Sequence, residues 1–269
     1  MADDLDALPQ VPESCLDTLP SDHRTFGSGI DPGAVGAISA HVEDEYYPQI
    51  HNKNVCYIFN NRNPFQKMSN EEEDVEHLRQ SLISLNFQCT LFNDKTAMEI
   101  YDALIEVAST VNNVDCFICW IITYGDKHCL YAGEPLELDR LVSPFTGDVC
   151  PSLFGKPKLF FFQAITSDRE PDTLDMSEIL RETYRIPAVA DFCFLFSSPP
   201  GYLECGVSQL VRIVSDVMDA AIPGEPGYMD LSTLWTLVAQ RAEGNQQIPC
   251  LMSTLTRHVK FSKRSTSLR

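Results

Sequence analysis

The sequence has few positive charges, and this shortage excludes several kinds of partner. Its 269 residues contain 20 Lys and Arg against 38 Asp and Glu, for a net charge of −18. A chain this acidic is a poor candidate for binding nucleic acid or anionic membranes electrostatically. It lacks any apolar run near the ~20 residues of a membrane helix, and its N-terminus, MADDLDALPQ, has no signal-peptide pattern. We therefore expect a cytoplasmic protein with neither nucleic-acid nor membrane partners.

The sequence also lacks motifs for cofactors and metals. No GxGxxG or GxxxxGK[ST] follows a strand pattern, which argues against a nucleotide-binding α/β fold. Cys116 and Cys119 have CxxC spacing, but they lie inside an apolar run, and no second CxxC or HxxxH accompanies them. We expect these two cysteines to be buried in a strand. Without a secretory signal, the ten cysteines are expected to be reduced. No cofactor and no metal site are expected.

Periodic apolar segments predict the fold class. Residues 1–44 are acidic, interrupted by proline and without apolar period, which is typical of a disordered leader. Beyond them, strand patterns alternate with helical ones, and two capping boxes, beginning at Ser69 and Thr96, mark helix starts. The pattern predicts a single α/β domain with about six mostly parallel strands and helices on both faces. The expected strands are 55–59, 87–92, 117–122, 157–162, 192–196 and 249–261, and the later helices are 207–220 and 231–242.

Several ordered segments carry the motifs of one known family. The sequence Gln163-Ala164-Ile165-Thr166-Ser167 ends one predicted strand, and Thr123-Tyr124-Gly125 ends another. Segments 197–202 and 247–256 follow in the family's order. Over roughly residues 45–261 the chain resembles the caspases, cysteine proteases that cut after aspartate, and in particular the effector-like members. The resemblance implies a caspase-like fold.

The resemblance breaks at the residues that carry the chemistry. Ile165 stands where the family has its nucleophilic cysteine, and Tyr124 stands where it has its catalytic histidine. Isoleucine has no nucleophilic atom, and a phenol with a pKa of about 10 is a poor base at neutral pH. Gln163 matches the glutamine that holds the substrate aspartate, and Gly125 matches the backbone donor to the oxyanion. The pocket's two arginines have no counterpart near residues 68–70 or 203–206. We therefore predict a catalytically dead caspase homologue, or pseudocaspase.

The family's division into subunits implies further regions and cleavage sites. Residues 45–165 correspond to the large subunit, 166–185 to the intersubunit linker and 186–269 to the small subunit with a basic tail. Asp172 and Asp175 are candidate cleavage sites in the linker, although this stretch is equally consistent with a solvated acidic loop. Cleavage after Asp6 would expose Ala7-Leu8-Pro9-Gln10, which resembles the tetrapeptide that inhibitor-of-apoptosis proteins bind through its free amine.

The last predicted strand gives the expected partner. In caspases it pairs across the dimer axis, and an unpaired apolar edge is an aggregation hazard. We expect heterodimerisation with an active caspase in the apoptosis pathway, with activation and inhibition equally open, and a homodimer is possible. The alternatives are a competitor for inhibitor-of-apoptosis proteins and a hydrolase with an atypical nucleophile, Thr166 or Ser167, assisted by His128. The candidate interface residues are Cys250, Leu251, Met252, Ser253, Thr254, Leu255 and Thr256.

Overall fold

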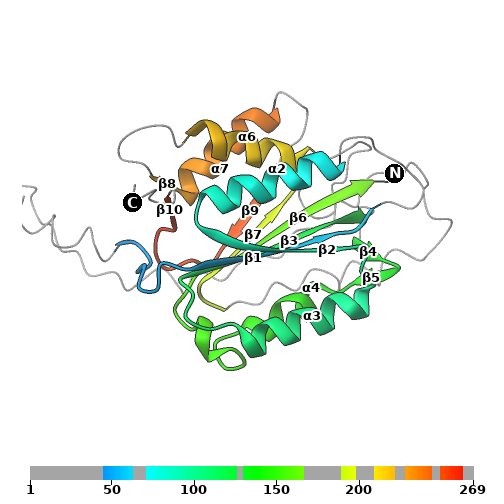
Figure 1. The fold of residues 1–269 in the computed structure, drawn as a ribbon, viewed down its shortest axis with the longest axis horizontal. Coiled ribbons are helices and arrows are strands. Elements are labelled where there is room, and N and C mark those ends of the chain that lie inside the picture. The colour runs from blue at the N-terminus through cyan, green and yellow to red at the C-terminus, as the bar shows by residue number, and fades with distance from the viewer. Residues whose placement is uncertain are drawn as a thin grey trace, which may run out of the picture. The chain divides into compact units, whose positions relative to one another are not determined.

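One twisted sheet organises the molecule, and helices cover both of its faces (Figure 1). The computed structural model describes residues 45–62, 71–125, 130–166, 189–197, 209–221, 228–243 and 249–262. The acidic leader, residues 1–44, lies outside the described residues, as do 167–185 of the linker. All described elements belong to one compact unit, His41–Arg269. The predicted α/β layering is confirmed.

The main path of the sheet contains six strands in the order β2-β1-β3-β6-β7-β9. All neighbouring pairs are parallel except β7 and β9. A short hairpin, which the sequence pattern did not predict, extends β3 at its carboxyl end. The strands are β1 (Asn54–Asn60), β2 (Phe87–Asn93), β3 (Cys116–Gly125), β6 (Lys158–Thr166), β7 (Phe192–Phe196) and β9 (Cys250–Ser253), with the hairpin β4 (Leu130–Ala132) and β5 (Glu134–Leu136).

The two faces of the sheet bury separate cores. Central strands are mostly apolar and are buried along nearly their whole length because helices cover both sides, as expected for parallel strands. Against one face pack α2 (Glu71–Ser84), α6 (Leu210–Ala221) and α7 (Leu231–Glu243). Against the other pack α3 (Ala97–Thr110), α4 (Leu138–Val142) and the 3₁₀ turns Ser143–Phe145 and Pro151–Leu153.

Helix α3 begins where its capping box predicts. The Thr96 side chain accepts a hydrogen bond from the Glu99 amide at 3.3 Å, and the Glu99 carboxylate accepts one from the Thr96 amide at 2.9 Å. The hydrogen bond from the Thr96 amide, followed by one from the Lys95 ammonium, lowers the pKa of the Glu99 carboxyl to about 2. Ser69 of the other predicted capping box lies outside the described residues; α2 is described from Glu71.

The prediction of one last strand over 249–261 is wrong. The chain forms β9, Cys250–Ser253, and then β10 (Lys260–Ser262), which pairs with β8 (Tyr228–Asp230) in a second sheet. Just past β9, the Thr254 hydroxyl donates to the Val189 carbonyl at 2.6 Å, and the Thr254 amide donates to the Phe192 carbonyl at 2.8 Å. Thr256 is then held by Tyr47, whose hydroxyl accepts from the Thr256 amide at 3.0 Å. Thr254, Leu255 and Thr256 therefore follow the edge strand rather than belonging to it.

Candidate functional site at the carboxyl end of the sheet

The two positions where the sequence analysis predicts replaced catalytic residues lie side by side in the sheet. Strands β3 and β6 pair in parallel, and their register places Tyr124 directly opposite Ile165 and Gly125 opposite Thr166. Carboxyl ends of parallel strands meet at one edge of a sheet, which is where α/β folds bind their ligands. The structure therefore brings together the two positions that the sequence analysis singled out, which are 41 residues apart in the chain.

Tyr124 is held by the hairpin that follows it. Its ring stacks on Tyr131 of β4, with centroids 6.1 Å apart and planes at 11°. Its hydroxyl accepts a hydrogen bond from the Gly133 amide at 2.9 Å. Gly133 has a φ of +81°, a conformation that favours glycine, and forms the turn between β4 and β5. The Tyr124 phenol thus has a structural partner on the hairpin.

Gln163 is also engaged by the protein's own backbone. The side chain is buried, with 6% exposed, and its Oε1 accepts a hydrogen bond from the Val211 amide at 2.8 Å. That amide belongs to the first turn of α6, where backbone N–H groups have no helical acceptor. The side-chain oxygen of Gln163 therefore binds the start of α6, whereas a substrate carboxylate would be bound by the side-chain amide nitrogen.

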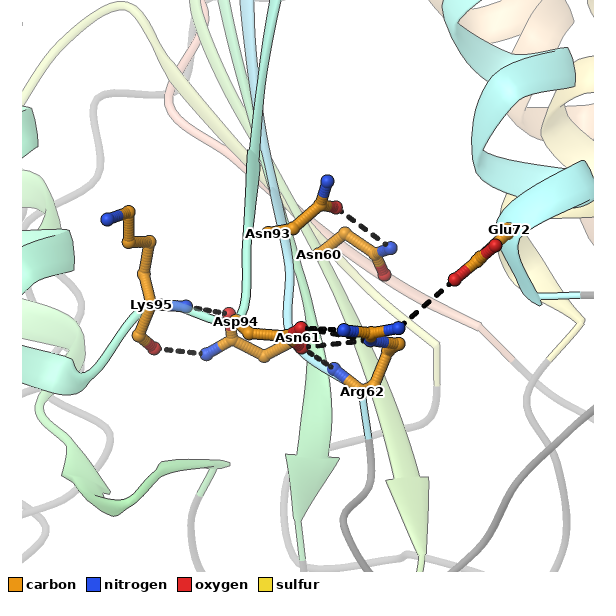
Figure 2. Close-up of polar contacts among 7 residues, drawn as sticks. All are labelled: Asn60, Asn61, Arg62, Glu72, Asn93, Asp94 and Lys95. Atoms are coloured by element: carbon orange, nitrogen blue, oxygen red, sulfur yellow. Dashed lines mark hydrogen bonds and ion pairs between the residues drawn. The ribbon is translucent and has the colours of Figure 1, made fainter.

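A polar cluster joins the ends of β1 and β2 at the same edge (Figure 2). Asn61 exchanges two hydrogen bonds with the Lys95 backbone, through its amide nitrogen at 2.6 Å and its amide oxygen at 2.9 Å. Arg62 binds Asp94 with two nitrogens and reaches Glu72 of α2 at 3.2 Å. The hydrogen bonds from Arg62 hold the pKa of the Asp94 carboxyl below its ordinary value.

The Arg62 guanidinium already has two carboxylate partners within this cluster, so it is engaged by the protein's own side chains. Sequence reasoning missed it, although the pair Asn60-Asn61 is a turn signal. The partners Asp94 and Glu72 are separated from Arg62 by 32 and 10 residues, so no local pattern relates them.

Many of the other predicted site residues cannot be located. Asp6, Asp172, Asp175 and the tetrapeptide of residues 7–10 lie outside the described residues. So do His128, Ser167, and the segments 68–70 and 203–206 where the family's arginines would stand. These expectations stay predictions.

The edge strand β9 is described as far as Ser253. Its hydrogen-bonded neighbour is β7, in antiparallel register, and β9 ends the strand order of the described sheet. Met252 is 39% exposed, while Leu251 packs partly against the core. An open groove of about 500 Å³ runs beside this edge, lined by residues of β9, of the start of α7 and of the segment that follows β9.

The CxxC cysteines behave as the sequence predicts. Cys116 and Cys119 are buried in β3, with at most 2% exposed, and burial raises the pKa of both thiols. Thiols in such surroundings are unreactive. Within the described residues, no helix has the length and apolarity needed to span a membrane.

Comparisons with known proteins identify the class to which this fold belongs. A family model for the caspase domain matches residues 53–260. The sequence is 30% identical to caspase drICE of Drosophila melanogaster over 246 residues, which covers 81% of this chain and 72% of the relative. It is 30% identical to caspase-7 of Gallus gallus over 238 residues, covering 77% of this chain and 76% of the relative.

A solved structure gives the same result. Caspase-1 from Spodoptera frugiperda superposes with a TM-score of 0.66 at 29% identity, covering 83% of this chain and 96% of that one. The chain belongs to the caspase family and has its caspase-like fold.

Proposed function

We propose that this chain is a non-catalytic caspase homologue that regulates an active caspase. The observation that carries the proposal is the register of β3 and β6. It sets Tyr124 against Ile165, at the two positions where the family resemblance assigns the histidine and the cysteine. Peptide hydrolysis by this family needs a thiolate nucleophile and a group that transfers protons near neutral pH. Loss of one member of such a unit removes most of the rate, and here both are replaced.

One further contact supports a loss of catalysis. The Tyr124 hydroxyl oxygen already accepts a hydrogen bond from the Gly133 amide. This oxygen would have to leave that donor before it could accept a proton in place of the family's histidine. Arg62, a guanidinium at the same edge, is bound to Asp94 and Glu72. Within the described part of this region, Arg62 thus has little charge left to offer a substrate aspartate, which needs charge-assisted partners when buried.

The proposed mode of regulation is strand pairing through β9. A strand with one neighbour presents free N–H and C=O groups on its other side, which a second strand can bind. Leu251 and the neighbouring groove provide apolar area beside this edge. An active caspase that docks here would receive a folded partner without a second catalytic centre. We propose that this pairing takes place in the cytoplasm.

The proposal is tested by titrating the full chain into an active caspase while following cleavage of an aspartate-terminated fluorogenic peptide. We expect the partner's rate to change, upward for an activating partner and downward for an inhibitor. Met252→Asp places a charge on the exposed edge and should raise the half-effective concentration at least tenfold. Met98→Asp is the matched control, because Met98 of α3 is 50% exposed and remote from β9 in the fold; it should act as wild type.

Other outcomes separate the alternatives. Turnover by the chain alone that survives purification and is lost in a Ser167→Ala variant would establish a hydrolase with an atypical nucleophile. A flat titration combined with binding to an inhibitor-of-apoptosis protein after cleavage at Asp6 would favour the competitor role. Equal effects of Met252→Asp and Met98→Asp would exclude β9 as the interface.

A further inference from the structure

Two cysteines face each other across neighbouring strands at the β2 edge of the sheet. Cys56 of β1 and Cys89 of β2 are register partners in a parallel pair. Both lie on the face covered by α2 and α6, where Cys56 is fully buried and Cys89 packs against the same core while partly exposed. Neighbouring strands lie about 4.8 Å apart, within the Cα separations of roughly 4.4–6.8 Å that disulfides span.

Burial gives the two thiols different access to an oxidant. Cys56 is fully buried, and burial raises the pKa of its thiol well above the ordinary value. Cys89 is only partly buried, and the neighbouring Cys56 thiol lowers the pKa of Cys89. The Cys89 sulfur also lies 3.9 Å from the carbonyl oxygens of Arg79 and Phe87. Cys89 is therefore the thiol of the pair that an oxidant in solution reaches first.

No other cysteine in the described strands has this arrangement. Cys116 is opposite Asn54, Cys119 is opposite Tyr57 and Phe160, and the register partners of Cys193 and Cys250 are not cysteines either. Burial also raises the pKa of each of these thiols. Partial exposure alone does not distinguish Cys89, because Cys250 is partly exposed as well.

We propose that Cys56 and Cys89 form a reversible redox pair that closes to a disulfide when the protein meets a peroxide. The Cys89 thiolate attacks hydrogen peroxide, breaks its O–O bond and becomes a sulfenic acid, releasing hydroxide. The Cys56 sulfur then attacks the Cys89 sulfur, its proton leaves with the sulfenic oxygen as water, and the S–S bond forms. Peroxide is reduced by two electrons and the thiol pair is oxidised by two. A thiol reductant reverses the bond by supplying two electrons and two protons.

The bond would have a defined structural consequence. It would tie the edge strand β2 covalently to β1 and close the stretch of chain between them, which contains α2. Closing a loop of this length removes conformations from the unfolded chain. We expect the oxidised protein to unfold at a temperature several degrees higher than the reduced one.

The test maps the bond in the full chain. Reduced protein is treated with hydrogen peroxide under native conditions, free thiols are alkylated, and the protein is digested with trypsin without reduction. Cleavage at the basic residues flanking each cysteine isolates peptides 54–62 and 80–95. We expect these two peptides to be joined in monomeric protein, at a mass two hydrogens below their sum, and to separate on reduction.

Variants distinguish the pair from general oxidation. Cys89→Ser should abolish the joined peptide, and Cys56→Ala should leave Cys89 as a sulfenic acid that dimedone traps. Cys119→Ala is the matched control, since it removes a buried thiol of the neighbouring strand β3, and it should keep the joined peptide. The proposal is overturned if oxidised wild type carries Cys89 unlinked, or linked to any cysteine other than Cys56. This result is measured on the wild-type protein, so it does not depend on whether any variant folds.

Discussion

Cys119 in the centre of the sheet and Cys89 at its β2 edge have thiols of opposite chemical character. Cys119 in β3 is covered on both faces and has no exposed surface, and burial raises the pKa of its thiol. Cys89 in β2 is partly exposed, and the neighbouring Cys56 thiol lowers the pKa of Cys89. Position in the sheet, rather than residue type, decides which cysteine can react.

The centre of the sheet and its edge strands also differ in the functions that we propose for them. The central strands β3 and β6 provide stability, and they carry Tyr124 and Ile165, the positions at which we propose that the catalytic residues are replaced. The edge strand β9 carries the partly exposed Met252, where we propose that a partner pairs. The two proposals can be tested separately, because they depend on different residues.

The largest expected effect is a loss of stability caused by a substitution in the centre of the sheet. Phe160 of β6 is fully buried among five other phenylalanine rings whose centroids lie 5.8–6.4 Å away. Phe160→Ala should lower the free energy of unfolding by about 4 kcal/mol, because it removes a large apolar group and leaves a cavity. Met252→Ala at the β9 edge should lower it by less than about 1 kcal/mol. Urea unfolding measures both free energies. Similar losses of stability in the two variants would contradict the contrast between the centre of the sheet and its β9 edge.

An intermediate effect concerns the buried lysine of β6. Lys158 is 2% exposed, and its ammonium donates to the carbonyls of Leu153 and Lys156 at 3.1 and 2.8 Å. Burial lowers its pKa to about 8, whereas the unfolded chain keeps the proton until about pH 10.4. Between these values the unfolded state binds more protons, so this group makes the protein more stable as pH rises.

The measurement compares wild type with Lys158→Met, in which this group cannot titrate. The free energy of unfolding of wild type relative to the variant should increase by on the order of 3 kcal/mol from below pH 8 to above pH 10.4. A difference that stays constant with pH would mean that the native lysine titrates as it does in water.

The smallest expected effect is on how stability depends on pH, and it tests the comparison of the Cys119 and Cys89 thiols. Above about pH 8.5 an unfolded thiol ionises, while the Cys119 thiol in the native protein stays protonated. Wild type should therefore lose stability relative to Cys119→Ala by about 1.4 kcal/mol per pH unit. For Cys89→Ala the sign is reversed, because the lowered pKa of Cys89 makes the native state release its proton first. Unfolding curves between pH 7.5 and 10 give the stability of wild type relative to each variant. If this difference changes with pH in the same direction for both variants, the two thiols do not differ in the way described.

Local sequence patterns predicted most of the sheet but not how distant segments meet. Apolar runs placed β1, β2, β3, β6 and β7, and the box at Thr96 placed the start of α3. The network around Asp191 was not predictable. Its carboxylate accepts from the hydroxyls of Tyr47 and Thr256, each at 2.7 Å, across separations of 144 and 65 residues. The same limit explains the error at the last strand, which ends where Thr254 and Thr256 find these distant partners.

The sequence alone predicted that the family's chemistry is missing, because Ile165 and Tyr124 stand in recognisable motifs and their side chains have fixed chemical capacities. It also determined the fold class, since strand and helix periods are local properties of the chain. The tertiary structure decided which residues became neighbours. It held the Tyr124 hydroxyl on the Gly133 amide, bound Gln163 to α6 and set Cys56 opposite Cys89. The physical reason is that the register between two strands is a choice of alignment made by the packing of the whole sheet, and a shift of one residue would turn every side chain to the other face.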